Sequence, residues 1–355
     1  MVLLGSTGSI GVNALIVASR FDISVEVLVA GKNIKTLNEQ ILKHSPKVVV
    51  IADEKDIPNV NHSNVYAGNE AILQVIEDSQ SELVVNALVG FLGLRPTLKA
   101  IECGKKVALA NKESLVACGA FINMKNIQPI DSEHFGLWYL LQDRPVQKMI
   151  ITASGGAFRD WDIKRLHNAT LEDTQKHPNW SMGQKITIDS ATMVNKMFEL
   201  LEARWLFGEG KYDAIIETQS LIHALIDFKD GSTTAHFANA SMQLPIAFAL
   251  DKNMDENILE HVDLVKTGSL EFREITCDRY PIWEIKNNLL LHPTQGVIVN
   301  AANEAAIQLF IDKKIGFMDI SKNIIKAYEK FTEVATTIDD VFLIDTEVRT
   351  FVRAI

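Results

Sequence analysis

The sequence predicts an α/β protein whose N-terminal part is a doubly wound, Rossmann-like domain. Short segments rich in Val and Ile alternate with helical patterns of about ten residues through residues 1–110, which is typical of a parallel sheet buried on both faces. A glycine-rich turn joins the first strand to the first helix. Three helical patterns follow Thr294 and predict a small helical domain at the C-terminal end.

The composition is that of a globular protein of 355 residues, long enough for roughly two or three domains. Its net charge of -10 argues against non-specific nucleic-acid binding, which needs a basic face. No apolar run approaches the ~18 residues of a membrane span, and no signal-peptide pattern is visible. Cys103, Cys118 and Cys277 are widely spaced and predict free buried thiols in a reducing, cytoplasmic compartment.

The chain opens with a strand, a glycine turn and a helix, the context that a dinucleotide-binding fingerprint requires. Met1–Leu4 is the predicted strand, GSTGSIG at residues 5–11 is the turn, and Asn13–Phe21 is the helix. Glycines let the backbone approach a pyrophosphate, which then lies at the helix N-terminus. The spacing is GxxGxxG rather than GxGxxG, so a glycine turn without a ligand stays an alternative.

The end of the second predicted strand, residues 25–30, indicates which nucleotide binds. An NAD site usually has Asp or Glu here to hold the ribose 2′-hydroxyl. This chain has Gly31, Lys32 and Asn33 instead. Because a cation and an amide favour a 2′-phosphate, the sequence predicts NADP(H) rather than NAD.

The later elements follow from the same periodicities. In the first part we expect helices at 34–44, 69–78 and 96–103 and strands at 47–52, 83–89 and 106–110. Beyond it we expect strands at 127–130, 149–152 and within 217–237, and helices at 245–250, 296–313, 318–331 and 338–353. The predicted division is a nucleotide-binding domain at 1–126, a catalytic domain at 127–255 with a lid at 154–184, a linker at 256–290 and a helical domain at 291–355.

Two polar segments follow predicted strands. Asn111-Lys112-Glu113-Ser114 opens a helix at the carboxyl end of the sheet, where ligands bind; a capping motif with a solvated lysine is the alternative. Asp131-Ser132-Glu133-His134 carries two carboxylates two residues apart, which can point the same way at a strand end. Mg²⁺ and Mn²⁺ prefer such oxygen ligands, so this segment predicts a metal site, with a solvated acidic turn as the alternative.

The segment after the strand at 149–152 predicts an anion site and a lid. Backbone amides in the turn Ser154-Gly155-Gly156 can form a concavity for an anion, although a plain turn remains possible. From there to Gly183 the sequence is long and irregular, as lids often are. Trp180 and Met182 near His177 favour a lid that covers a ligand, with a structural role for His177 as the alternative.

The segment DSATMVNK at residues 189–196 leads into another helix. Asp189 or Ser190 can cap that helix. Asn195, Lys196 and Glu199 share one helical face, and an amide, a cation and a carboxylate together suit a phosphate and a metal. An exposed ion pair is the alternative. The opposite face is apolar and is predicted to be core: Met193, Met197, Leu200 and Leu201.

These segments resemble one family when they are taken together. GSTGSIG, AGKN, NKES, DSEH, SGG, HPNWSMG and DSATMVNK, in this order and spacing, are similar to the 1-deoxy-D-xylulose 5-phosphate reductoisomerases over nearly the whole chain. The resemblance implies a homodimeric enzyme that depends on NADPH and on Mg²⁺ or Mn²⁺. It implies a carbon-skeleton rearrangement of the substrate to an aldehyde, then hydride transfer from NADPH. The implied product is 2-C-methyl-D-erythritol 4-phosphate, an isoprenoid precursor.

The resemblance also implies residue roles. It implies these NADPH contacts: Thr7, Gly8, Ser9, Ile10, Gly31, Lys32, Asn33, Asn111, Glu113 and Gly183. It implies three metal ligands: Asp131, Glu133 and Glu199. It implies these substrate contacts: Lys112, Ser132, Glu133, Ser154, His177, Ser190, Asn195, Lys196 and Glu199. The catalytic set that follows is Lys112, Asp131, Glu133, His177 and Glu199.

Two departures from the family pattern are visible. The chain has Glu217-Thr218-Gln219-Ser220 where the family usually has His-Pro-Gln-Ser, and Ala157 follows Ser-Gly-Gly where the family usually has Pro. Neither position is an implied ligand, so both bear on local loop shape and on rate rather than on the activity.

Two other function classes stay open. A nicotinamide dehydrogenase acting on an unrelated phosphorylated substrate would share the glycine turn but would not need three carboxylates, so EDTA would leave its rate unchanged. A non-catalytic NADPH-sensing protein would bind the cofactor without turnover. Following NADPH absorbance with the keto-sugar phosphate separates it from an enzyme.

Overall fold

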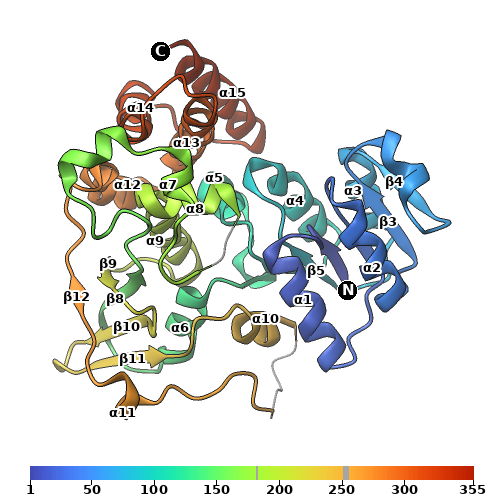
Figure 1. Cartoon of the computed structure of the whole chain (residues 1–355), viewed down its shortest axis with the longest axis horizontal. Coiled ribbons are helices and arrows are strands. Elements are labelled where there is room, and N and C mark those ends of the chain that lie inside the picture. Colours follow the sequence, from blue (N-terminus) through green and yellow to red (C-terminus); the bar gives the residue numbers. More distant parts are fainter. Residues whose placement is uncertain (181–182, 251–255) are drawn as a thin grey trace. The chain divides into compact units, whose positions relative to one another are not determined.

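A computed structural model describes residues 1–180, 183–250 and 256–355, and its elements are labelled in Figure 1. The chain forms two compact units. The first comprises Met1–Ser114, Asn123–Ser132 and Ser241–Leu259, and the second comprises Leu115–Ile122, Glu133–Ala240 and Glu260–Ile355. The four-part division expected from the sequence stays a prediction; its boundary at residue 255 and parts of its lid, residues 181–182, lie outside the described residues.

The first unit contains a seven-stranded parallel sheet in the order β4-β3-β2-β1-β5-β6-β7. Its strands are β1 (Val2–Leu4), β2 (Val27–Val29), β3 (Val48–Ile51), β4 (Val65–Ala67), β5 (Leu83–Asn86), β6 (Lys106–Leu109) and β7 (Ile127–Pro129). From β1 the chain adds strands in one direction as far as β4 and then in the other direction from β5. Right-handed crossovers therefore place helices on both faces of the sheet, which confirms the doubly wound prediction.

Helices cover this sheet and close its core. They are α1 (Ser9–Arg20), α2 (Ile34–His44), α3 (Asn69–Asp78), α4 (Leu94–Glu102), α5 (Lys112–Cys118), which begins in this unit, and α10 (Gln243–Leu250). Strand residues such as Leu3 and Leu28 are fully buried, as expected for strands covered on both faces. Helix α10 is remote in sequence, yet it packs on α1 and adds Ile246 and Ala247 to the same core.

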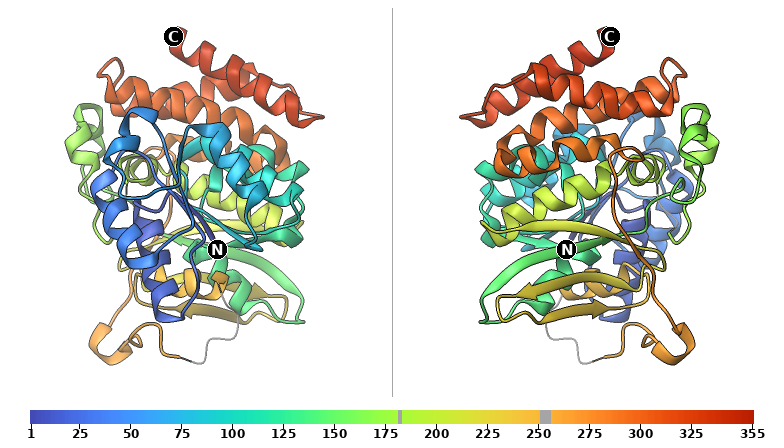
Figure 2. Two further views of the ribbon diagram at one scale, coloured as in Figure 1. Left: turned by 90° about the vertical axis from the view of Figure 1, so that its right-hand side faces the viewer. Right: turned by 90° about the vertical axis from the view of Figure 1, so that its left-hand side faces the viewer.

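The second unit contains a five-stranded mixed sheet in the order β11-β10-β8-β9-β12. Its strands are β8 (Val146–Ala153), β9 (Tyr212–Glu217), β10 (Ile222–Phe228), β11 (Thr233–Phe237) and β12 (Phe272–Arg273). Strand β8 is parallel to β9 and antiparallel to β10, and Figure 2 shows the green and yellow strands side by side. Its helices before the C-terminal bundle are α6 (Ser132–Leu140), α7 (Leu171–Thr174), α8 (Gln184–Thr192), α9 (Val194–Phe207), α11 (Leu264–Thr267) and α12 (Lys286–Leu291).

Three helices end the chain, as the sequence predicts. They are α13 (Gly296–Ile311), α14 (Phe317–Lys330) and α15 (Ile338–Ala354), and Figure 1 shows them together beside the C-terminus. Helix α13 packs against both of the others and is apolar almost all round, with Val297, Ile298 and Val299 fully buried. It is therefore the central helix of this bundle.

Two local expectations are wrong. Strand β7 ends at Pro129 and α6 begins at Ser132, so Asp131 and Glu133 do not alternate along a strand. Asp189 and Ser190 lie inside α8 rather than capping the next helix. The helical backbone is interrupted at Met193, whose φ of 69° separates α8 from α9. The sequence pattern shows the helical period, but it does not show at which residue one helix ends and the next begins.

The cysteines only partly match the expectation of buried thiols. All three are free, but Cys118 is buried while Cys277 is exposed. Burial raises the pKa of the Cys118 thiol to about 12, so this thiol is inert at neutral pH. Among the described residues, each helix is too short or too polar to cross a bilayer.

The glycine turn after β1 gives the first testable prediction. A Cβ at Gly11 would lie 2.3 Å from the Gly5 carbonyl oxygen, a contact that backbone cannot relieve easily. Gly11→Ala should therefore lower the free energy of unfolding by about 1–3 kcal/mol. Gly31→Ala is the matched control, since nothing lies within 4 Å of a Cβ there. Urea unfolding checks both, and equal stability of the two variants would contradict the packing argument.

Candidate active site

The glycine turn follows β1 at the point where the strand order reverses. Gly5 has a φ of +84°, and a Cβ there would lie 2.6 Å from the Ala87 carbonyl oxygen, so only glycine fits. Helix α1 begins at Ser9 with Gly8 at its N-cap. Dinucleotides bind at this kind of switch point, with their pyrophosphate at the helix N-terminus. The turn residues Thr7, Gly8, Ser9 and Ile10 all retain solvent exposure.

The end of β2 is open to solvent. Gly31, Lys32 and Asn33 are all exposed. The side chain of Asn33 accepts a hydrogen bond from the amide of Thr36, 3.2 Å away, and so caps α2. Asn33 therefore has a structural role in addition to any contact with a nucleotide, whereas the Lys32 side chain extends from an exposed position.

The segment at residues 111–114 is buried. The side-chain Nδ2 of Asn111 donates to the carbonyl oxygens of Leu88 and Gly90, 2.9 and 2.8 Å away, and so fixes that loop. Lys112 is 7% exposed, and its Nζ lies 2.8 Å from Asp131 Oδ2. The alternative of a solvated lysine is therefore wrong: the first unit pairs Lys112 with the first carboxylate of the DSEH segment. Glu113 and Ser132 are also buried.

The central feature of the second unit is Lys196, which lies between two carboxylates. Its Nζ is 2.7 Å from Glu133 Oε1 on α6 and also contacts Glu199 Oε2 one turn along α9. Asn195 Nδ2 donates to the other oxygen of Glu199 at 2.5 Å. Asn195, Lys196 and Glu199 thus share one face as predicted, but the alternative of an exposed ion pair is wrong, since Lys196 is 4% and Glu199 2% exposed.

The charges of this group are coupled. Burial alone would lower the pKa of Lys196, but the nearby Glu133 and Glu199 carboxylates outweigh burial and hold the pKa above its ordinary value. Lys196 is therefore an ammonium ion that balances one of its two carboxylates. One net negative charge remains, which suits a site that also attracts a cation.

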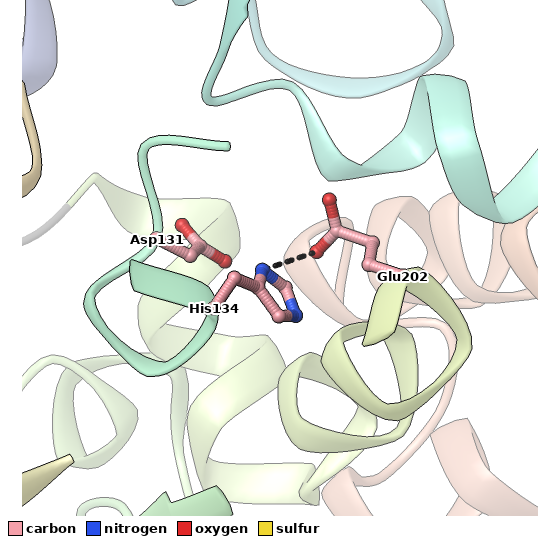
Figure 3. A group of neighbouring side chains, drawn as sticks. All are labelled: Asp131, His134 and Glu202. Atoms are coloured by element: carbon pink, nitrogen blue, oxygen red, sulfur yellow. Dashed lines mark ion pairs between the residues drawn. The ribbon is translucent and has the colours of Figure 1, made fainter. Parts of the chain in front are cut away.

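A buried histidine that the sequence reasoning missed supports the same group. His134 Nε2 lies 2.9 Å from the Glu199 carbonyl oxygen, which can only accept, so Nε2 carries the proton. His134 Nδ1 lies 3.9 Å from Glu202 Oε2, the ion pair drawn in Figure 3. His134 therefore connects the helix that carries Glu133 to the helix that carries Glu199. The available signal was Glu202 three residues after Glu199, on the same helical face.

Ser154 and His177 form a second polar pair in this unit. His177 Nδ1 accepts from the backbone amides of Asn179 and Trp180 at 3.2 and 2.9 Å. Its Nε2 must then carry the proton, which it donates to Ser154 Oγ, 2.8 Å away. Gly156 N also donates to Ser154 Oγ at 3.2 Å. Since Ser154 Oγ accepts from both, its own proton is directed toward a further acceptor, as an anion site requires.

The Ser-Gly-Gly turn lies against α8. Gly155 and Gly156 have φ of +85° and +68°, and a Cβ on Gly156 would lie 2.6 Å from the Ser190 carbonyl oxygen. Only glycine permits this approach, so the turn brings the Ser154 segment next to Ser190. Gly183 is exposed at the N-cap of α8 in the same unit.

The fold and these side chains define a class of protein. The chain combines a doubly wound parallel sheet, which has a glycine turn at its switch point, with a mixed-sheet unit that carries carboxylates, a buried lysine and a Ser–His pair. This combination is typical of cofactor-dependent α/β enzymes. Family models match residues 1–119 (1-deoxy-D-xylulose 5-phosphate reductoisomerase), 127–207 (1-deoxy-D-xylulose 5-phosphate reductoisomerase C-terminal domain) and 237–351 (DXP reductoisomerase C-terminal domain). The chain belongs to the 1-deoxy-D-xylulose 5-phosphate reductoisomerase family, which confirms the resemblance.

Relatives extend over the whole chain. It is 58% identical over 358 residues to the reductoisomerase of Nautilia profundicola, with 98% of each chain covered, and 49% identical to that of Wolinella succinogenes, with 99% of each covered. Among solved structures, the Zymomonas mobilis reductoisomerase in complex with NADPH is 34% identical, with a TM-score of 0.88, 99% of this chain and 97% of that chain covered. A DOX-P reductoisomerase in complex with NADPH, fosmidomycin and magnesium is 30% identical, with a TM-score of 0.92 and the same coverage.

The Ser154–His177 pair gives a prediction for pH dependence. Burial, with a smaller effect of Arg159, lowers the pKa of His177 from 6.5 to about 4. The unfolded chain therefore binds a proton more readily in this window, and the free energy of unfolding decreases as the pH falls from 6.5 to 4. His177→Gln removes this contribution, so the free energy of unfolding of the variant should decrease less over the same pH range. Urea unfolding across the window checks this, and parallel pH profiles for the two proteins would contradict it.

Proposed function

We propose that the chain converts 1-deoxy-D-xylulose 5-phosphate to 2-C-methyl-D-erythritol 4-phosphate, using NADPH and a divalent metal. The observation that carries this proposal is the buried Lys196 between Glu133 and Glu199, in a chain that belongs to the reductoisomerase family. The reaction rearranges the carbon skeleton to an aldehyde. A hydride from NADPH and a proton then reduce that aldehyde to an alcohol.

Asp131, Glu133 and Glu199 are the proposed metal ligands. Their carboxylate oxygens fit Mg²⁺ or Mn²⁺, and the excess negative charge of the Glu133–Lys196–Glu199 group favours a cation. A bound divalent cation supplies Lewis-acid polarisation of the substrate carbonyl. His134 holds α6 against α9 through the Glu199 carbonyl oxygen, so it keeps two of the proposed ligands in register.

The substrate phosphate is proposed to lie among hydroxyl, amide and ammonium donors: Ser154, His177, Ser190, Asn195 and Lys196. Two of the three donors of the Lys196 ammonium go to Glu133 and Glu199, which leaves one for a phosphate oxygen. The Ser154 hydroxyl proton is likewise directed away from the groups that donate to it. Lys112 and Ser132 are proposed further substrate contacts, and the segment 154–184 is proposed as a lid over the site.

NADPH is proposed to bind at the glycine turn and at residues 31–33 of the first unit, with Asn111 and Glu113 as further contacts. Gly183 is also a proposed NADPH contact. The switch point of the parallel sheet supports this assignment. We further propose a cytoplasmic homodimer that uses Mg²⁺ or Mn²⁺. The three free cysteines support a reducing compartment.

Lys32 tests the choice of nucleotide. Lys32→Asp replaces an exposed cation by an anion, which repels a 2′-phosphate. The preference for NADPH over NADH, measured as the ratio of kcat/KM values, should fall about tenfold or more. Lys35→Asp is the matched control, because it makes the same charge change from an exposed position within α2. An unchanged ratio in Lys32→Asp would show that this loop does not read the 2′-phosphate.

Glu199 tests the metal site. Glu199→Gln keeps the size and removes the charge, so the Mg²⁺ or Mn²⁺ concentration for half-maximal activation should rise and turnover should fall more than about tenfold. Metal-dependent stabilisation against heat should weaken in parallel, since a native-state ligand stabilises the fold. NADPH affinity should stay near wild type, because the nucleotide lies on the first unit.

Glu209→Gln is the control for this variant, since Glu209 is exposed just beyond α9 and pairs only weakly with Arg204 at 3.3 Å. It should keep the wild-type activation curve. If Glu199→Gln also kept the wild-type activation curve, Glu199 would not be a metal ligand.

A further inference from the structure

Glu217 departs from the family pattern and has an unusual environment. It is the last residue of β9 and is fully buried. Its carboxylate accepts hydrogen bonds from three backbone amides. Gln219 N lies 2.7 Å from Oε1, and Leu221 N and Ile222 N lie 2.7 and 3.1 Å from Oε2. A buried carboxylate is costly unless such donors satisfy it. The neutral histidine of the family pattern offers at most one acceptor nitrogen, so it cannot reproduce these bonds.

These bonds fix the turn between β9 and β10. Ser220 within it has a φ of 56°, in the left-handed region that a serine rarely occupies without support. Because one carboxylate binds residues 219, 221 and 222 together, it holds the turn in this conformation. The turn in turn presents the Thr218 carbonyl oxygen and the Ser220 hydroxyl toward neighbouring loops.

Two loops attach to this turn at the same carbonyl oxygen. Thr218 O accepts from Arg159 Nη1 at 2.9 Å and from Asn179 Nδ2 at 3.0 Å. Asn179 Nδ2 also lies 2.7 Å from Ser220 Oγ. The Glu217 turn therefore anchors the segment that follows the Ser-Gly-Gly turn and, separately, the segment that contains His177.

Both attachments lead directly to the Ser154–His177 pair. The same Arg159 Nη1 that binds Thr218 O also donates to Ser154 O at 3.0 Å. The backbone amide of Asn179 donates to His177 Nδ1 and so helps to set the proton on Nε2. Ser154 and His177 lie 23 residues apart in the sequence. Ser154 is hydrogen-bonded to Arg159 and His177 to Asn179, and both of these partners also donate to Thr218 O.

We propose that Glu217 is a positioning residue for substrate binding, which acts through the Thr218 carbonyl oxygen to hold Ser154 and His177 in contact. This inference rests on the proposed role of Ser154 and His177 as substrate contacts. Glu217 touches neither substrate nor cofactor. It determines whether the Ser154 hydroxyl is held as a donor toward the substrate phosphate.

The test is steady-state kinetics of Glu217→Gln with 1-deoxy-D-xylulose 5-phosphate, Mg²⁺ and NADPH. Glutamine has one acceptor oxygen, so at least one amide of the turn loses its partner. The substrate KM should rise about tenfold, the effect of one lost charge-assisted bond, while kcat changes less and the KM for NADPH stays unchanged. Asp227→Asn on β10 is the matched control and should keep wild-type constants, since its carboxylate pairs with Lys148 and Thr233 instead.

A double-mutant cycle separates positioning from a general loss of stability. Asn179→Ala should raise the substrate KM by itself, and the double variant with Glu217→Gln should raise it less than the product of the two single effects. A lowered melting temperature for Glu217→Gln with an unchanged substrate KM overturns the proposal. An increase in substrate KM for the double variant that equals the product of the two single increases also overturns it. If Glu217→Gln does not fold, Asn179→Ala decides alone, and an unchanged substrate KM overturns the proposal.

Ser154→Ala distinguishes this proposal from the one on which it rests. If Ser154→Ala leaves the substrate KM unchanged, the proposed substrate contact is wrong and the positioning role falls with it. If Ser154→Ala raises the substrate KM but Glu217→Gln and Asn179→Ala do not, only the positioning role is wrong.

Discussion

The second unit depends on one electrostatic arrangement, a buried ammonium between two carboxylates. Lys196 could not remain charged at 4% exposure without Glu133 and Glu199, and the Glu199 carboxylate could not be buried without Lys196 or another cation. The arrangement requires α6 and α9 to meet at a fixed register. His134 supplies that register by bonding to the α9 backbone at Glu199. The charges of the proposed metal and phosphate site therefore also constrain the packing of α6 against α9.

The polar pairs differ in how they are held. The Glu133–Lys196–Glu199 group is fixed by charge on two helices, which are rigid elements. Ser154 and His177 lie on loops, and backbone amides and carbonyl oxygens hold them instead, with Thr218 O as a shared acceptor. A site built in both ways can keep the proposed metal ligands fixed while the proposed substrate contacts on the loops adjust. The departure at Glu217 then has a physical meaning, because a carboxylate can organise a turn that a histidine cannot.

Much of the fold was predictable because its signals are local. The predicted helices at 34–44 and 69–78 have the bounds of α2 and α3, and the C-terminal helices differ from prediction by a few residues at their ends. The glycine spacing at 5–11 predicted a turn that only glycine can form. The prediction that Asp131 and Glu133 point the same way at a strand end was wrong. The strand ends at Pro129 and a helix begins at Ser132, so strand alternation does not apply to these two residues.

The sequence by itself determined the family, the alternating architecture and which residue types carry the chemistry, because periodicity and motif spacing are properties of neighbouring residues. Only the tertiary structure decided that Lys196 is buried rather than exposed, that His134 bonds to the Glu199 carbonyl oxygen, and that the turn after Glu217 is hydrogen-bonded to Arg159 and Asn179 through Thr218 O. Each of these depends on contacts between segments tens of residues apart. Such contacts arise from the packing of whole elements, which no local pattern of residues specifies.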